Sequence, residues 1–125
     1  MAKAEIGGMC PFFVVGDVDR SLGFYRDLLG FAVIYREPFY GIVQRGAAML
    51  FVKSEAGIAP LPNARRHPHL RWDAYVQVAD PDALASEFAG CGVIFSVPLA
   101  DTADGLRGFE VADPDGHVLF FGRPR

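Results

Sequence analysis

The stretch "VGDVDRSLGFYRDLLGF" (residues 15–31) decides the fold, because it joins the end of a strand to an amphipathic helix and a second strand. Leu22 and Tyr25 fall on one face at helical spacing, and Gly30 supplies a C-terminal stop. The residues just before the helix alternate between inward and outward positions, as in a half-buried strand. The stretch therefore predicts a strand, a helix and a return to strand.

The same pattern occurs a second time in "AYVQVADPDALASEFAGCGV" (residues 74–93). Asp80 is placed to cap a helix, and Pro81 suits the first helical turn. Leu84 and Phe88 share one face of that helix. Two copies of about fifty residues indicate an internal duplication.

Each predicted helix is followed by three strand-like runs, which gives the order βαβββ twice. Neither copy alone would bury its sheet face well, so the two are expected to pack as one domain spanning residues 1–125. The expected modules cover about residues 9–55 and 72–123, with a linker over 56–71. The predicted strands are residues 31–37, 40–45 and 47–53 after the first helix, and residues 93–98, 106–112 and 117–122 after the second.

Composition limits the class of protein. The chain has 125 residues, is 51% hydrophobic and 22% charged, and carries a formal net charge of −3. That charge argues against a general nucleic-acid binder, and no apolar run is long enough to span a bilayer. The N-terminus lacks the apolar core of a signal peptide, and two cysteines do not make a disulfide framework. We therefore expect a cytoplasmic protein with no nucleic-acid or membrane partner.

The linker is rich in proline and basic residues. Its charged side chains, Arg65, Arg66, His67, His69 and Arg71, are expected to be solvated on a surface loop. His67 and His69 alone do not fill a metal site.

The runs "VGDVDRSLGFYRDLLGF", "VADPDAL" (78–84) and "GLRGFEVADPDGHVLFFG" (105–122) resemble the vicinal oxygen chelate superfamily. This superfamily contains glyoxalases, bleomycin-resistance proteins and dioxygenases. Among its branches, the chain looks most like the bleomycin-resistance type. The resemblance implies an α+β fold in which two tandem βαβββ modules form an open, cleft-bearing β-barrel, usually in a homodimer.

The resemblance also implies positions at which the family's enzymes hold a metal. They fall on Cys10, on Asp73 and, in the last strand, on Phe120. Catalytic zinc sites use about three protein ligands, so a thiol and one carboxylate are too few. Cys10 is expected to pack as a small hydrophobe. His117 follows the turn that begins at Asp113, and a turn or strand-start role is expected for it.

Strand parity predicts what lines the cleft. Cys10, Phe12 and Val14 share one face, and Val118 shares a face with Phe120. For the strand at 47–53, parity does not choose between the set of Ala48, Leu50 and Val52 and the set of Ala47, Met49 and Phe51. The residues predicted to bind a ligand are Phe12, Trp72, Asp73, Tyr75, Gln77, Arg107 and Phe120.

Two function classes remain. The ligand count favours a metal-independent protein, without a cofactor, that binds an aromatic, drug-like or toxin-like small molecule such as an antibiotic. The alternative is a metal-dependent lyase, isomerase or dioxygenase of the same superfamily. No catalytic residue is assigned.

Overall fold

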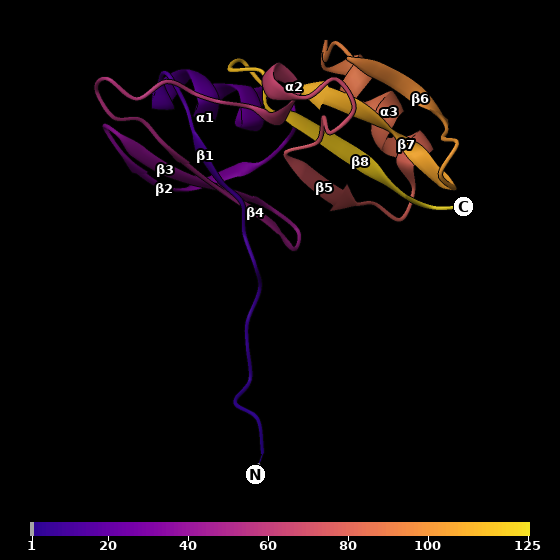
Figure 1. Cartoon of the computed structure of the whole chain (residues 1–125), viewed down its shortest axis with the longest axis horizontal. Coiled ribbons are helices and arrows are strands. Elements are labelled where there is room, and N and C mark those ends of the chain that lie inside the picture. The colour runs from indigo at the N-terminus through magenta and orange to yellow at the C-terminus, as the bar shows by residue number, and fades with distance from the viewer. Residues whose placement is uncertain (1) are drawn as a thin grey trace.

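The computed structural model describes residues 2–125. The two modules lie side by side, the first in indigo to magenta and the second in orange to yellow (Figure 1). Each contains one four-stranded sheet, in the orders β1-β4-β3-β2 and β5-β8-β7-β6. Over the described chain the sheets remain separate and open, so the predicted α+β fold of two βαβββ modules is confirmed.

The elements follow the duplicated order, with one short extra helix in the linker. The first module contains β1 (Phe12–Val14), α1 (Val18–Asp27), β2 (Ala32–Glu37), β3 (Tyr40–Arg45) and β4 (Ala48–Lys53), and the linker contains α2 (Asn63–Arg66). The second module contains β5 (Ala74–Gln77), α3 (Pro81–Gly90), β6 (Val97–Asp101), β7 (Leu106–Ala112) and β8 (Val118–Pro124). In each sheet the first and last strands of the module pair in parallel and the other pairs are antiparallel.

Both long helices begin with an aspartate N-cap. Asp17 accepts a hydrogen bond from the backbone N–H of Arg20, and Asp80 accepts one from Ala83. These side chains satisfy backbone donors that the first turn of a helix leaves without a partner. After α1, Gly30 has φ of 72°, a conformation that favours glycine.

The sixth strand begins four residues later than the sequence pattern predicted. Residues 93–96 are apolar enough to look like a strand, but they lead from α3 into the core, where Val93 is buried. Pairing with β7 starts at Val97, and the register shifts between Val97 and Ala100, around Pro98. Proline has no N–H to donate to the ladder, which fits its place at this irregularity.

One hydrophobic core joins the modules, because the helix-facing sides of both sheets meet in it. Tyr25, Leu22 and Val52 from the first module and Phe88 and Phe109 from the second are fully buried in this single cluster. The structure also resolves the parity question in β4: Leu50 and Val52 face the core. Ala47, Met49 and Phe51 are therefore on the other side.

The turn between β7 and β8 fastens the two modules together. Asp113 in this turn accepts a hydrogen bond of 3.0 Å from the Tyr25 hydroxyl of α1. Asp115 accepts one of 3.1 Å from the backbone N–H of Gly16 and pairs with Arg20 at 3.0 Å. His117 is buried, and its ring stacks on Phe13 of β1 with 4.3 Å between ring centroids. This histidine has the turn role expected of it.

Candidate ligand-binding face

The open side of the second sheet carries a stack of aromatic rings. Trp72, just before β5, lies parallel to Phe120 of β8 at 4.2 Å between centroids, with 21° between the planes. Tyr75 of β5 flanks Phe120 at 5.8 Å and lies 5.9 Å from Trp72. Phe120 is only 2% exposed, so it supports the surface that Trp72 and Tyr75 present to solvent. These three predicted site residues are brought together.

Two glycines make room for this stack. Gly108 of β7 and Gly122 of β8 are opposite one another in the ladder. A Cβ atom at Gly108 would lie 2.6 Å from the Phe120 ring, and one at Gly122 would lie 2.5 Å from it. Real Cβ atoms do not approach so closely, so the Phe120 ring lies flat against backbone on one side and Trp72 on the other.

A buried carboxylate holds the rim of the stack. Glu110 of β7 accepts a hydrogen bond from Trp72 Nε1 at 3.2 Å and pairs with Arg71 at 3.1 Å. Its side chain is 10% exposed, whereas that of Arg71 is 37% exposed. Because one oxygen meets the indole and the other meets the guanidinium, Glu110 fixes the orientation of the Trp72 ring. The expectation that all the linker charges are solvated is wrong for Arg71.

A hollow of about 400 Å³ opens beside the rim of this stack. Its walls combine two apolar side chains with five polar or charged ones: Trp72, Leu70, Asn63, His69, Arg71, Asp104 and Glu110. The volumes of small-molecule sites typically lie in the range of about 300–1,000 Å³. In this hollow the apolar surface comes from Trp72 and Leu70, and the other lining residues are polar or charged. We call the exposed surface of Trp72 and Tyr75, with this hollow and its Glu110 rim, the aromatic face.

Asp73 belongs to the framework of the same region. One of its oxygens accepts from the backbone N–H of Asn63 at 3.0 Å, and the other accepts from Val118 at 2.8 Å. The carboxylate thus ties the linker helix α2 to the start of β8. Its position beside Trp72 follows the prediction, but its oxygens are already engaged with backbone donors.

The remaining predicted residues lie apart from the stack. Gln77 is exposed at the end of β5, and Phe12 is 56% exposed on β1, where it lines a different groove together with Asp73. Arg107 is on the opposite side of β7 from Glu110, and it pairs with Asp82 of α3 and Asp101 of β6. These two pairs raise the pKa of Arg107 further above its ordinary range, by hydrogen bonding to Asp82 first and to Asp101 second. The structure does not bring Arg107 to the aromatic face.

The family's metal positions do not form a donor set here. Cys10 is exposed in the extended N-terminal segment, which projects away from the body (Figure 1), so the expectation that it packs against the cleft floor is wrong. Asp73 is engaged with backbone N–H groups, and Phe120 has no donor atom. The residues at these positions do not fit a metal ion.

Asp113, Asp115 and His117 are the one group of three potential metal ligands that lie close together in residues 2–125. Asp113 already accepts bonds from the backbone N–H groups of Asp115 and His117, from Tyr25 and from the His117 ring. The group acts as the hydrogen-bonded core of the turn, and we assign no ion to it.

Sequence reasoning missed Glu110 as part of the site. Alternation along "LRGFEVA" (106–112) puts Glu110 on the opposite face from Arg107, which was the residue predicted to bind a ligand. The sequence signal for Glu110 was that it is the single carboxylate of this strand and shares a face with Gly108. Gly108 and Gly122 were also missed, because their role depends on the ring of Phe120 crossing between strands.

A family model described as Glyoxalase/Bleomycin resistance protein/Dioxygenase superfamily matches residues 9–121. No curated protein matches the chain in sequence. No helix among residues 2–125 is long and apolar enough to cross a membrane.

Among solved structures, the bleomycin-binding protein of bleomycin-producing Streptomyces verticillus, complexed with copper(II)-bleomycin, is 25% identical with a TM-score of 0.74. The match covers 98% of this chain and 100% of that one. The bleomycin resistance determinant encoded on the transposon Tn5 is 20% identical, with a TM-score of 0.74 and coverage of 96% and 99%. TioX from Micromonospora sp. ML1 is 21% identical, with a TM-score of 0.69 and coverage of 94% and 100%.

Proposed function

Because the chain belongs to the glyoxalase/bleomycin resistance protein/dioxygenase superfamily, we propose that it binds and sequesters a planar aromatic, drug-like or toxin-like small molecule on the aromatic face. The family match confirms the resemblance seen in the sequence. The observation that carries the proposal is the preorganised stack: Trp72 is held by Glu110 and backed by Phe120 before any ligand arrives.

Preorganisation is what makes this surface suitable for binding. A flat ligand ring that stacks on Trp72 gains the offset-stacking attraction of aromatic pairs, about 0.5–1.5 kcal/mol beyond burial. Because the Trp72 ring is already fixed, little conformational freedom is lost when the ligand binds. The structural neighbour from Streptomyces verticillus was solved with copper(II)-bleomycin, which supports an antibiotic of that kind as the first ligand to test.

We propose that binding requires no metal held by the protein. The donor atoms at the family's metal positions support this, since Asp73 is engaged by Asn63 and Val118 while Phe120 is apolar. An enzyme of the superfamily would need about three ligands at an open position, and these positions do not supply them. Elemental metal content of tag-free protein purified without chelator tests this proposal: below 0.1 equivalent per chain supports it, and about one tightly held equivalent overturns it.

We further propose that the protein acts as a homodimer. Apolar side chains outside the aromatic face stay exposed on β1 and on the linker, including Phe12 and Leu61, which are 56% and 60% exposed. Exposed apolar surface of this kind is typical of a surface that is covered in solution. Light scattering coupled to size exclusion would give about twice 13.6 kDa if a second copy covers it, and a single-chain mass would refute the dimer.

The fluorescence of Trp72 tests the ligand proposal directly, because it is the single tryptophan of the chain. Bleomycin, its copper(II) complex and neutral quinoxaline and acridine dyes would be titrated separately. We expect saturable quenching with at least one of these compounds. Absence of saturable quenching by all of them would overturn the proposed function.

Two variants localise the signal. Tyr75→Ala removes an exposed ring of the aromatic face and should weaken binding about tenfold or more, which corresponds to about 1.4 kcal/mol. Ile94→Ala, which removes an exposed side chain on the loop before β6, should leave the affinity unchanged. Equal affinities in the two variants would contradict binding at the aromatic face.

A further inference from the structure

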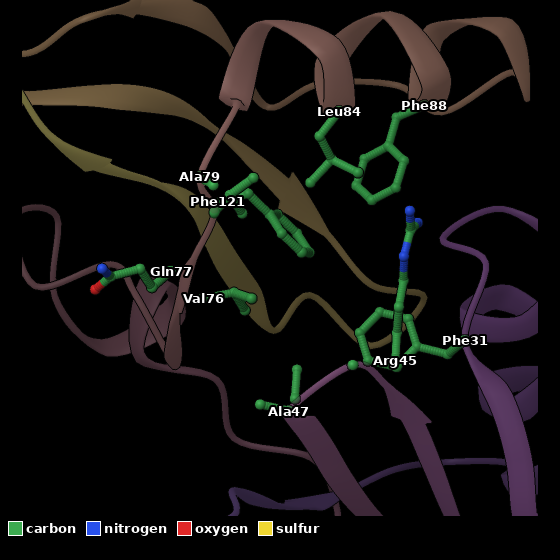
Figure 2. Close-up of a pocket in the computed structure, with 12 residues that line it drawn as sticks. Phe31, Arg45, Ala47, Val76, Gln77, Ala79, Leu84, Phe88 and Phe121 are labelled. Atoms are coloured by element: carbon green, nitrogen blue, oxygen red, sulfur yellow. The ribbon is translucent and has the colours of Figure 1, made fainter.

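The duplication creates two equivalent junctions between the modules, and they are filled differently. At the first junction, the five-residue turn 113–117 packs against α1 and β1. At the second junction, the corresponding turn between β3 and β4 consists of Gly46 and Ala47 alone. The shorter turn does not fill the space beside α3, and a cavity of about 410 Å³ remains there (Figure 2).

The walls of this junction cavity are mostly aromatic and aliphatic, and Arg45 and Gln77 are its polar lining side chains. In Figure 2 the side chains of Leu84 and Phe88 descend from α3, and Phe121 projects from the adjacent strand toward them. Phe31 closes the side formed by the first module. Phe88, Phe121 and Phe31 are each at most 5% exposed, so the cavity reaches the core.

Comparison of the two junctions shows what kind of group fits. Counting from the capping residues Asp17 and Asp80, Phe13 corresponds to Val76 and Tyr25 corresponds to Phe88. In the first junction, the His117 ring stacks on Phe13, and the Tyr25 hydroxyl donates a hydrogen bond to Asp113. In the second junction the equivalent positions hold Val76 and Phe88, so the hydroxyl of Tyr25 has no counterpart and both side chains are hydrocarbon.

The charges at the rim cancel. Arg45 of β3 contacts Glu87 of α3 through both terminal nitrogens, at 2.7 and 2.9 Å, and also donates to the carbonyl of Leu29. Because these two charges already neutralise each other, neither is left to pair with a charged ligand, which would lose hydration on entering the mostly apolar cavity. An uncharged ligand meets no such penalty.

We propose that the junction cavity is a second binding site, for an uncharged apolar small molecule of about the size of two fused aromatic rings. The volume falls within the range of ligand sites, and an apolar cavity of even 150 Å³ is known to hold benzene. Val76 of β5 lines the cavity and faces away from Tyr75, and Gln77 at the end of the strand lines it as well. The residues that line the cavity do not include Trp72, Tyr75 or Phe120. It is therefore separate from the aromatic face and does not depend on the function proposed for that face.

Indole is a suitable probe, because it is uncharged, has two fused rings and dissolves at millimolar concentration. Its titration into methyl-labelled full-length protein should shift the methyl signals of Leu84 and Val76 saturably. The matched charged probes, indole-3-acetate and tryptamine, should bind at least fivefold more weakly. Equal or tighter binding of either charged probe would overturn the assignment to an uncharged ligand.

Three variants separate the possibilities. Ala48→Leu adds volume to a residue that lines the cavity, and should weaken indole binding at least fivefold. Ala100→Leu, at an exposed position of β6, and Tyr75→Ala, on the aromatic face, should leave it unchanged. Loss of binding in Tyr75→Ala with retention in Ala48→Leu would overturn the proposal in favour of the aromatic face. Because Ala48→Leu can perturb folding, the unfolding curve of this variant is measured as a control. The wild-type titration tests the site independently of any variant: absence of a saturable shift of the Leu84 and Val76 methyl signals refutes the site.

Discussion

Replacement of Asp113 by alanine should lower the free energy of unfolding more than alanine replacement of any other single carboxylate in the second module. Its two oxygens accept from the Tyr25 hydroxyl at 3.0 Å, from the His117 ring at 2.9 Å, and from the backbone N–H groups of Asp115 and His117, each at 2.9 Å. The Asp113 side chain is fully buried. In Asp113→Ala these donors lose their acceptor, and water reaches them poorly.

The magnitude follows from the number of donors left behind. A buried donor without a partner costs about 1–3 kcal/mol, and neighbouring effects are not additive. Four such donors, partly relieved by relaxation of the turn, give an expected loss of about 4–6 kcal/mol. That is a large fraction of the roughly 5–15 kcal/mol that stabilises a typical domain.

Urea unfolding followed by circular dichroism measures the loss, with Asp19→Ala as the matched control. Asp19 also pairs with an arginine, Arg36, but its side chain is 73% exposed, so its removal should cost less than about 1 kcal/mol. Tyr25→Phe, which removes only the hydroxyl, should cost about 1–2 kcal/mol. If Asp113→Ala lies within 1 kcal/mol of Asp19→Ala, the turn does not fasten the modules as argued.

Three further outcomes are expected. Gly108→Ala should lower the free energy of unfolding in urea by about 1–3 kcal/mol, because its Cβ would lie 2.3 Å from the carbonyl oxygen of Phe121. The control Gly90→Ala has open space at the end of α3 and should be neutral or stabilising. Equal effects of the two substitutions would contradict the tight packing around Gly108. Burial first, and then the charge and hydrogen bond of Asp113, raise the pKa of Tyr25 well above 10.0. The stabilisation from its neutral hydroxyl is thus fully present below about pH 10 and is lost as the pH rises through the folded-state pKa, so wild type should lose stability in that range more steeply than Tyr25→Phe; parallel curves would refute this. Trp72→Ala should abolish ligand binding, followed by calorimetry, whereas Arg107→Ala should preserve it because its partners are on the helix side; a loss in Arg107→Ala would show that this arginine reaches the ligand.

The sequence by itself determined the architecture. Helix caps, glycine stops and apolar periodicity are local signals, and they occur twice in the same order, so two βαβββ modules followed from residues 12–31 and 74–93. Strand parity also put Phe12 on the face opposite Phe13 and Val15, which are buried, since alternation of side chains is a property of any extended strand. Where a local signal was ambiguous, as in residues 93–96, the predicted strand began four residues too early.

Only the tertiary structure decided which polar groups are free to act. Asp73 looked available in the sequence but is engaged by two backbone N–H groups, and Arg107 looked ligand-facing but pairs with α3 and β6. Glu110 belongs to the site because it accepts a hydrogen bond from Trp72, which is 38 residues away along the chain. Hydrogen bonds and close packing depend on distances between segments remote in sequence, and those distances exist only after the chain has folded. The cavity beside α3 has the same origin: the short turn is visible in the sequence, but the space that it leaves empty is set by how the two modules meet.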